Sequence, residues 1–248
     1  MIRIKNKRQI EGIRASCQML SALYDALKPL VQPGVTPKDL DRFAYDFMVK
    51  NGGKPAFLGY EGYPATLCIS INDVVIHGIP GSRPLEEGDI VGIDSGIDLD
   101  GFFSDAAITL PVGKITSEAQ KLLDVTKECL DLAIAQIKPH ARISDISRAV
   151  FSHATKNGFK VVRQYCGHGV GLEIHEDPQI PNYVSAGPNP RIMPGMVLAI
   201  EPMINVGTSD VRVLDDDWTV VTMDGSLSAH FEHTVLVTDS GCEVLTRW

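Results

Sequence analysis

The stretch that decides the fold reads Ile90-Val-Gly-Ile-Asp94-Ser-Gly-Ile-Asp-Leu-Asp-Gly101-Phe-Phe-Ser-Asp105-Ala-Ala-Ile-Thr-Leu110. Two apolar runs flank a turn-forming segment, residues 98–101, which is typical of a β-hairpin. A four-residue loop there would place Asp94 directly opposite Asp105 on one face, with Cβ atoms about 4.5–5.5 Å apart. Carboxylates so close repel each other, and a metal ion between them is the simplest remedy. From this stretch alone, two aspartates that flank a turn on a solvated edge are an equally good interpretation.

Composition and charge place the chain among ordinary globular proteins. Its 248 residues, 44% hydrophobic and 22% charged, suffice for one large domain or two small ones. With 23 basic and 31 acidic side chains the net charge is −8, which disfavours nucleic acid or an anionic membrane as main partner. No apolar run is long enough to span a bilayer, and no signal-peptide core follows the basic first eight residues. Five cysteines without CxxC spacing predict neither a disulfide framework nor a zinc knuckle, which favours a cytoplasmic location.

Four segments carry the apolar periodicity of amphipathic helices. The expected helices span residues 7–30, 37–50, 117–137 and 144–156. Strands and turns follow each pair of helices, so the order helix, helix, strands occurs twice. That order predicts an α+β protein and raises the question of an internal repeat.

An internal repeat is present around the hairpin. At an offset of 107 residues, Gly88-Asp-Ile-Val-Gly-Ile-Asp94 aligns with Gly195-Met-Val-Leu-Ala-Ile-Glu201. Asp94 and Glu201 are therefore counterparts at the ends of two corresponding strands. A single match of this kind could arise by chance, so further acidic or histidine correspondences are needed.

Two further correspondences involve the same residue types. The strand around Asp105 resembles the strand around Glu232, and His77 in Ile-His-Gly-Ile-Pro resembles His168 in Gly-His-Gly-Val-Gly. Each half thus supplies one histidine and two carboxylates in the same order. We therefore expect one domain made of two related, pseudo-symmetric halves, about 1–112 and 113–248, around one shared site.

This set of residues predicts a dinuclear metal centre. Four carboxylates and a histidine that converge on a pseudo-dyad would repel strongly, and one divalent ion would leave excess negative charge. Two divalent ions bridged by carboxylates balance that charge and can together activate water and polarise a carbonyl, as in dinuclear aminopeptidases and phosphatases. The oxygen-rich set without thiolates suits Mn, Fe or Co as well as Zn.

Other catalytic and cofactor-binding motifs are incomplete or absent. Gly167–Gly171 looks like a dinucleotide loop, but Leu172 stands where its last glycine is required. His175-Glu176 lacks the second histidine of HExxH, and Pro178 would break the helix that this motif needs. The sequence contains no Walker motif and no GxSxG elbow. A serine or cysteine nucleophile therefore has no support.

Six motifs, in order and with matching spacing over nearly the whole chain, closely resemble those of type I methionine aminopeptidases. They are Gly59-Tyr-Glu-Gly-Tyr-Pro64, Asn72-Asp-Val-Val-Ile-His-Gly-Ile-Pro80, Asp94 with Asp105, Gly167-His-Gly-Val-Gly-Leu-Glu-Ile-His175, Glu201-Pro202 and Phe231-Glu232-His233. The resemblance implies the pita-bread fold, in which two pseudo-symmetric α+β halves surround a dinuclear metal site with a curved antiparallel sheet covered by helices.

The resemblance also implies a role for each site residue. Five residues would hold two divalent ions (Co, Mn, Fe or Zn): Asp94, Asp105, His168, Glu201 and Glu232. Asp94 would bind one metal only, whereas Asp105 and Glu232 would bridge both. Three residues would act on the substrate or its proton: His77, His175 and Glu201. Besides His77 and His175, four residues would line the pocket for the methionine side chain: Tyr60, Tyr63, Cys68 and Trp218.

Each of these residues, considered alone, also has a purely structural interpretation. His77 alone is more typical of a core or loop histidine, and its match to His168 is what favours the site. Three pocket candidates are aromatic residues that, taken alone, are more often part of a core or a loop: Tyr60, Tyr63 and Trp218. Cys68 is more typical of a packed thiol than of a reactive one. His230 shares the face of Glu232 but is a weak candidate, and His233 should face the other way.

Four positions depart from the family pattern without touching the ligands. Phe57 stands where cysteine is frequent, Ile174 where phenylalanine is common, and Thr66 where serine is usual. Glu61 adds a charge near the substrate entrance. These departures bear on the shape of the pocket and on which first and second substrate residues it tolerates.

The expected function is removal of the N-terminal methionine from nascent polypeptides whose second residue is small. We expect a cytoplasmic monomer with transient ribosome association, and neither nucleic acid nor membrane as a partner. The nearest alternative is a proline-specific relative, aminopeptidase P or prolidase, which usually carries a large extra N-terminal domain. A catalytically dead binding scaffold of the same fold is the other alternative, and the intact set of five ligands speaks against it.

Overall fold

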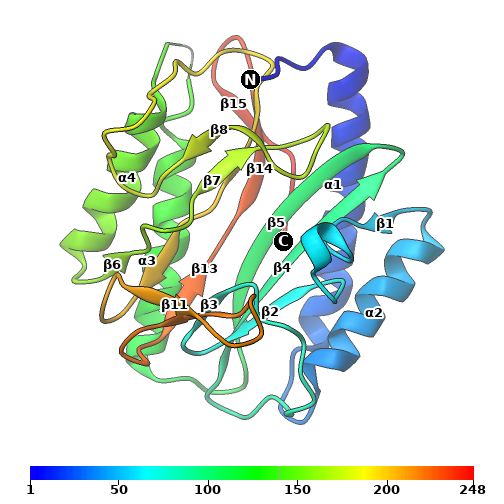
Figure 1. The fold of residues 1–248 in the computed structure, drawn as a ribbon, viewed down its shortest axis with the longest axis vertical. Coiled ribbons are helices and arrows are strands. Elements are labelled where there is room, and N and C mark those ends of the chain that lie inside the picture. Colours follow the sequence, from blue (N-terminus) through cyan, green and yellow to red (C-terminus); the bar gives the residue numbers. More distant parts are fainter. Residues whose placement is uncertain (139) are drawn as a thin grey trace.

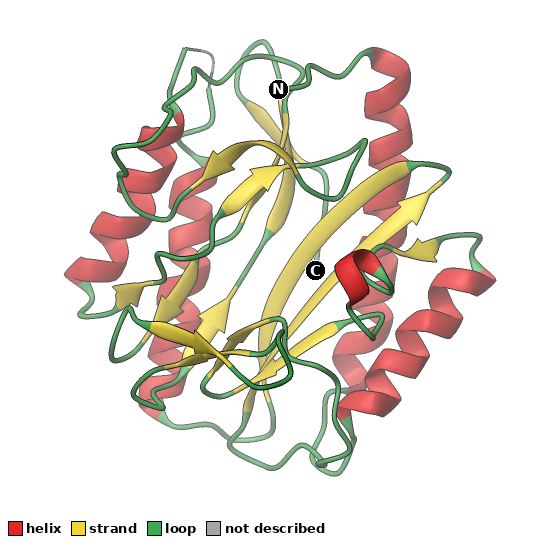
Figure 2. Ribbon diagram, viewed as in Figure 1, coloured by secondary structure: helices red, strands yellow, loops and turns green. Residues whose placement is uncertain are grey.

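Two pairs of helices flank the strands of the computed structural model, which describes residues 1–138 and 140–248. Helices α1 (Lys7–Leu27) and α2 (Pro37–Lys50) lie along one flank, and α3 (Ser117–Ile134) and α4 (Ile143–Lys156) lie along the other (Figures 1 and 2). The predicted α+β class is therefore confirmed. The first and third helices are shorter at their C-termini than predicted, since a 3₁₀ turn at Lys28–Leu30 follows α1.

Local side chains explain where three of these helices begin. Asn6 and Gln9 form a reciprocal capping box at the start of α1. Thr36 accepts a hydrogen bond from the Asp39 amide, and Pro37 supplies the fixed φ of a first helical residue in α2. Thr116 caps α3 in the same way.

Strands β4 (Ile90–Leu99) and β5 (Phe102–Pro111) form the predicted hairpin with a different register. The loop has two residues, Asp100 and Gly101, both at positive φ (54° and 81°), so Leu99 pairs with Phe102. Asp94 consequently pairs with Ala107 rather than with Asp105, and the predicted direct opposition is wrong. The observed register differs from the predicted one by two residues, and an even shift keeps Asp94 and Asp105 on the same face of the hairpin.

The remaining strands complete four small sheets. In the first sheet, β4 pairs with β5, β1 (Lys54–Pro55) and β2 (Cys68–Ile71). The second follows the order β15-β14-β9-β7-β8, with these bounds: β7 Gly167–Gly169, β8 Glu176–Ile180, β9 Val197–Ile200, β14 His233–Val237 and β15 Cys242–Val244. Two three-stranded sheets comprise the others: β6 Lys160–Val161, β10 Met203–Asn205, β13 Ser228–His230, β3 Val74–Ile76, β11 Val211–Val213 and β12 Val220–Thr222. Residues 60–62, expected as strand or loop, form a 3₁₀ turn.

One backbone contact joins the two larger sheets. The Glu232 amide donates to the Ala107 carbonyl at 2.8 Å, which pairs the residue before β14 with a residue of β5. Because Ala107 also pairs with Asp94, this contact brings the carboxylates of both halves to one place.

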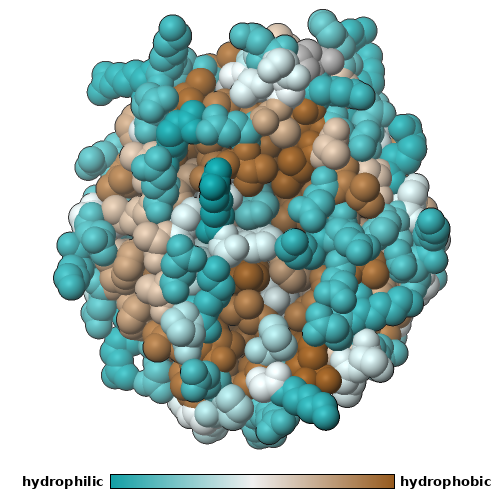
Figure 3. Space-filling view, turned by 180° about the vertical axis from the view of Figure 1, so that it is seen from behind, coloured by the Kyte–Doolittle hydropathy of each residue, from teal (hydrophilic) through white to brown (hydrophobic). Residues whose placement is uncertain are grey.

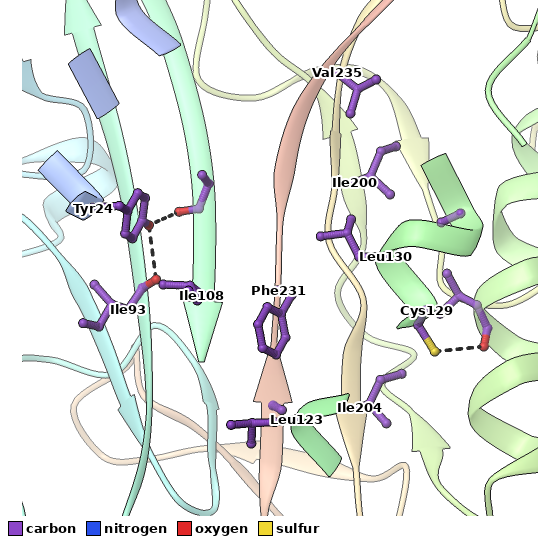
Figure 4. Packing of buried hydrophobic residues seen from close by; sticks show 14 of the residues in the cluster. Tyr24, Ile93, Ile108, Leu123, Cys129, Leu130, Ile200, Ile204, Phe231 and Val235 are labelled. Carbon is purple, nitrogen blue, oxygen red and sulfur yellow. Dashed lines mark hydrogen bonds between the residues drawn. The ribbon is translucent and has the colours of Figure 1, made fainter. Parts of the chain in front are cut away.

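The main hydrophobic core runs continuously from α1 and β4 to α3 and β9. Residues such as Ile93, Leu130 and Ile200 are completely or almost completely buried in it (Figure 4). Tyr24 of α1 donates its buried hydroxyl towards the carbonyls of Ile93 and Ala106, the residues next to Asp94 and Asp105. The helix therefore ties the hairpin at the point where its acidic residues lie.

The outer surface carries mixed polarity. Seen from behind, apolar side chains reach the surface in patches that hydrophilic side chains interrupt (Figure 3). Among residues 1–138 and 140–248, no helix has the length and apolar character that crossing a membrane requires.

Candidate metal centre

A single cavity of about 620 Å³ is lined by every residue that the sequence predicted for the site. These residues are Tyr60, Tyr63, Cys68, His77, Asp94, Asp105, His168, His175, Glu201, Trp218 and Glu232. They come from segments spread between residues 60 and 232 of the sequence, and the fold brings all of them together.

The buried acids lie on the two larger sheets where these sheets meet. Asp94 and Asp105 lie on β4 and β5, Glu201 directly follows β9, and Glu232 directly precedes β14. His168 is the central residue of β7 and pairs with Ala199 of β9. Each of these five side chains is therefore held by a strand or by a strand end, which gives the candidate ligands a rigid frame.

Three ligand atoms form the tightest group. One atom each of Asp105, His168 and Glu232 lies within 4.8 Å of the other two. The His168 Nε2 atom is 3.6 Å from Asp105 Oδ2 and 3.4 Å from Glu201 Oε1. The opposite ring nitrogen, Nδ1, is 2.8 Å from the Gly169 carbonyl, which can only accept, so Nδ1 carries the proton. Burial lowers the His168 pKa to about 3, and the Nε2 lone pair therefore faces the carboxylates as a metal ligand does.

The carboxylates are electrostatically frustrated without a cation. Burial raises the pKa of Asp94 to about 7. The pKa values of Asp105, Glu201 and Glu232 lie well above their usual range, because of burial first and of repulsion by neighbouring acids second. Among residues 1–138 and 140–248, no lysine or arginine pairs with these four acids. The histidines beside them, His168 and His230, are neutral at neutral pH because their pKa values are lowered to about 3.

Unpartnered atoms give a direct test of whether this set fits a metal. Asp94 Oδ1, Asp105 Oδ1 and Glu232 Oε1 are buried without a hydrogen-bond partner in the part of the chain described. An orphaned buried carboxylate oxygen is costly, and three in one cavity call for a shared cation. The donor set of carboxylate oxygens and one imidazole nitrogen fits a divalent metal.

Two histidines lie beside the acids without joining them. His175 is exposed at the cavity mouth, where its Nδ1 is 3.0 Å from the Tyr60 hydroxyl and its ring lies 4.4 Å from that of His168. Surrounding protein lowers its pKa. His77, at a positive φ of 58°, meets Trp218 edge-on, and burial lowers its pKa to about 4. Both rings are therefore neutral hydrogen-bonding groups at neutral pH.

An apolar wall faces these histidines. Phe57, Tyr63, Cys68 and Ile174 pack as one buried cluster, with Trp218 against it. The Tyr63 hydroxyl lies 3.0 Å from both the Leu67 and the Gly78 carbonyls, so its polar end is bound to backbone. Burial raises the pKa of the Cys68 thiol well above its usual value, which makes it a packed group rather than a nucleophile.

His230 is the site residue that sequence reasoning underrated. It lines the cavity, is only 4% exposed, and places Nε2 3.7 Å from Glu201 Oε2 with no hydrogen-bond partner among the described residues. Its signal was its spacing of two residues from Glu232, which puts both side chains on one face. His233 points away as predicted, since its ring stacks on Trp248 and contacts Thr246.

Comparisons with known proteins agree with this geometry. The profile of metallopeptidase family M24 matches residues 11–239. The sequence is 53% identical to a methionine aminopeptidase of Treponema pallidum, over all of this chain and 97% of that protein. It is 46% identical to methionine aminopeptidase 1 of Bacillus subtilis over the full length of both.

Solved structures show the same similarity in three dimensions. The crystal structure of methionine aminopeptidase from Rickettsia prowazekii matches with a TM-score of 0.97 and 39% identity, covering all of both chains. Prolidase from Pyrococcus furiosus matches with a TM-score of 0.81 and 25% identity, but 99% of this chain covers only 65% of that protein. The expected pita-bread fold is thereby confirmed.

Proposed function

The chain belongs to metallopeptidase family M24, and on that premise we propose that it is a methionine aminopeptidase, a hydrolase that removes the first methionine of a polypeptide. The observation that carries this function is the cavity itself, in which five metal-ligand candidates and two substrate histidines all meet. Full-length similarity to methionine aminopeptidases supports it.

We assign the metal ligands to Asp94, Asp105, His168, Glu201 and Glu232, which would together hold divalent ions. Divalent ions bound there would polarise the scissile carbonyl and lower the pKa of a water molecule. Four carboxylates supply enough negative charge for two such ions, and Co, Mn, Fe and Zn all suit the donor set.

The protein's own groups would hold and move protons around the reacting carbonyl. His175 can accept a hydrogen bond from the Tyr60 hydroxyl at Nδ1 and present Nε2–H to the cavity, where it would stabilise negative charge on the carbonyl oxygen. Glu201, whose pKa burial and Asp94 raise, is suited to take a proton from water and pass it to the leaving amine. His77 would bind the substrate from the opposite side.

The apolar wall would select the first residue of the substrate. The ring faces of Tyr63 and Trp218, which meet edge-on with centroids 5.1 Å apart, and the neutral thiol of Cys68 suit an unbranched apolar side chain. Tyr60 would shape the entrance together with His175. A small second residue is the expected preference.

Metal reconstitution tests this function. Metal-stripped protein is assayed on Met-Gly-Ser and on X-Pro peptides after addition of Mn, Fe, Co or Zn. We expect methionine release from the first peptide, and no release with any metal would contradict the proposal. Cleavage of X-Pro peptides alone would establish the proline-specific alternative, which the lower identity and TM-score of the prolidase match already make less favourable.

We also propose that the enzyme works as a cytoplasmic monomer on nascent chains, with transient ribosome association. The formal charge of −8 argues against a strong electrostatic grip on ribosomal RNA, so the binding should be weak. Co-sedimentation with ribosomes is expected at low salt and lost at high salt. Gel filtration with light scattering should give the mass of a single chain, and a dimer would contradict the monomer.

A further inference from the structure

The start of the chain lies beside the loop between β7 and β8, whose last residue is His175 (Figure 1). Lys5 Nζ donates to Glu176 Oε2 at 2.7 Å, and both side chains are only 1% exposed. Arg3 Nη2 donates to Glu173 Oε1 at 2.6 Å on the surface of the same loop. A segment of the N-terminus is thus paired by charge with a loop about 170 residues away.

The Glu176 carboxylate links this segment to the loop backbone. Its second oxygen, Oε1, accepts hydrogen bonds from the amides of Leu172 at 2.7 Å and Glu173 at 3.3 Å. Glu176 is the first residue of β8 and pairs with Gly169, the neighbour of His168. The carboxylate therefore closes the turn over residues 172–176, from which His175 projects.

Lys5 is itself held in place on two sides. Its amide donates to the Gly195 carbonyl at 2.8 Å. Its side-chain Cε atom lies 3.4 Å from where a Cβ of Gly171 would be, so the lysine stem packs along the start of the loop. Burial lowers the Lys5 pKa, opposed by the hydrogen bond and charge of Glu176. The ammonium group thus has one anchored carboxylate as its partner.

His175 has few contacts of its own that fix its position. Its ring meets those of Tyr60 and His168, and the residue is exposed at the cavity mouth. A buried ion pair is an expensive way to gain stability, because apolar residues of the same volume do as well or better. The pair instead selects one conformation of the loop, because both Glu176 carboxylate oxygens have hydrogen-bond partners in that conformation.

We propose that Lys5 and Glu176 are positioning residues, which hold His175 at the cavity mouth by fixing the turn over residues 172–176. The inference rests on the role proposed above for His175. It goes beyond that role by making the N-terminal segment part of the machinery that orients the histidine.

Lys5→Met tests the proposal by removing the charge and keeping the apolar stem. We expect kcat on Met-Gly-Ser to fall about 10- to 100-fold with KM changed less than threefold, because a small displacement of a catalytic group has effects of this size. Lys5→Arg, which can donate to Glu176, should recover most of kcat. Arg14→Met is the control, since it breaks a more exposed ion pair, with Glu243, and neither of these two residues lines the cavity.

A second measurement separates positioning from stability. Ring ¹⁵N and ¹³C NMR signals of the metal-free protein, with His175→Ala as the assignment reference, should show a shifted or broadened His175 in Lys5→Met. The signals of His230 and His233 should stay in place. Hydrogen exchange at the amides of Leu172 and Glu173 should become faster.

An unchanged kcat and an unmoved His175 signal in Lys5→Met would overturn the proposal. If that variant does not fold, Lys5→Met/Glu176→Gln replaces it, since the amide oxygen still accepts from Leu172 and no unpaired charge remains; wild-type kcat and His175 signal there would likewise overturn it. Wild-type protein inactive on methionine peptides would refute the proposed function instead, and the NMR comparison would still decide whether the pair positions His175.

Discussion

Phe57 and Ile174, two residues that depart from the family pattern, lie against each other in the pocket wall. The Phe57 Cε1 and Ile174 Cδ1 atoms lie 2.9 and 3.0 Å from where a Cβ of Gly96 would be, so both fill the space that this glycine leaves. The chain has a large side chain at position 57, where the family often has a small one, and a smaller one at position 174. The two departures therefore conserve the volume of the wall, and such exchanges are well tolerated.

Ile174→Phe alone should overpack this wall. We expect a loss of about 1–3 kcal/mol in the free energy of unfolding, because the ring has no free space beside Phe57. The double variant Phe57→Cys/Ile174→Phe should recover most of this loss. Ile174→Phe alone should also raise the KM for methionine peptides, and the double variant should lower it again. Urea unfolding of the wild type, both single variants and the double variant measures the coupling, and additive effects would contradict compensation.

His230 provides a second prediction at this scale. Its unpartnered Nε2 faces Glu201 Oε2, so the ring can orient a proposed metal ligand. His230→Leu should weaken Mn²⁺ binding by about 10- to 100-fold, as expected for loss of a group that orients a ligand. Calorimetric titration of the metal-free protein measures this affinity. His233→Leu removes an imidazole that faces away from the cavity, and equal losses in both variants would show that His230 has no specific effect.

At the scale of elements, α1 and the hairpin are joined by one buried hydroxyl. Tyr24 reaches the carbonyls of Ile93 and Ala106, which directly precede Asp94 on β4 and follow Asp105 on β5 (Figure 4). The helix thus fixes both acidic strands at once. Its amphipathic face contributes packing, and the hydroxyl adds a specific position along the strands.

Tyr24→Phe should therefore destabilise the fold without creating a cavity. We expect a loss of about 1–3 kcal/mol in the free energy of unfolding, because buried carbonyls lose a donor. Tyr45→Phe on the exposed side of α2 is the control and should change stability by less than about 0.5 kcal/mol. Chemical denaturation measures both variants, and a Tyr24→Phe protein as stable as the control would rule out the proposed tie.

These elements also show what the sequence could and could not predict. A shift of the strand register by two residues leaves every side chain on the same face, so the prediction that Asp94 and Asp105 share a face is correct. The register depended on which residues take positive φ, and Asp-Leu-Asp-Gly allows more than one choice, so the direct opposition was wrong. The Lys5–Glu176 pair joins residues 171 positions apart, and no local pattern signals such a contact.

At the scale of the whole molecule, charge is concentrated where the two larger sheets meet. The Glu232–Ala107 backbone contact joins these sheets, and the site around it holds the buried acids Asp105 and Glu232, the partly buried Asp94 and Glu201, and two buried histidines. The internal repeat predicted this convergence because each half supplies corresponding acids. Glu201 and Glu232 thereby add their charges to the repulsion between Asp94 and Asp105, and metal binding would offset this cost.

In the metal-free protein, the acids and histidines of this region affect stability in opposite directions. Asp94 has a pKa of about 7 in the folded state against about 3.9 unfolded, so the folded state binds more protons and stability falls as pH rises across that window. His168 and His230 have pKa values of about 3 against about 6.5 unfolded, so their effect is a rise in stability with pH up to about 6.5. Above that pH the histidine effect is complete, and only the acids continue to titrate.

The metal-free protein should therefore lose stability as pH rises from about 6.5 to 9. Each carboxyl that is still protonated in the folded state lowers the free energy of unfolding by about 1.4 kcal/mol per pH unit, which predicts a fall in Tm over this range. Mn²⁺ should abolish the fall, because the cation replaces the protons between the carboxylates. Thermal unfolding with chelator and with Mn²⁺ at each pH measures both effects, and Asp94→Asn, with one fewer titrating acid, should give a shallower slope in chelator. If the Tm measured with chelator stays level or rises between pH 6.5 and 9, these acids are not held protonated by the fold.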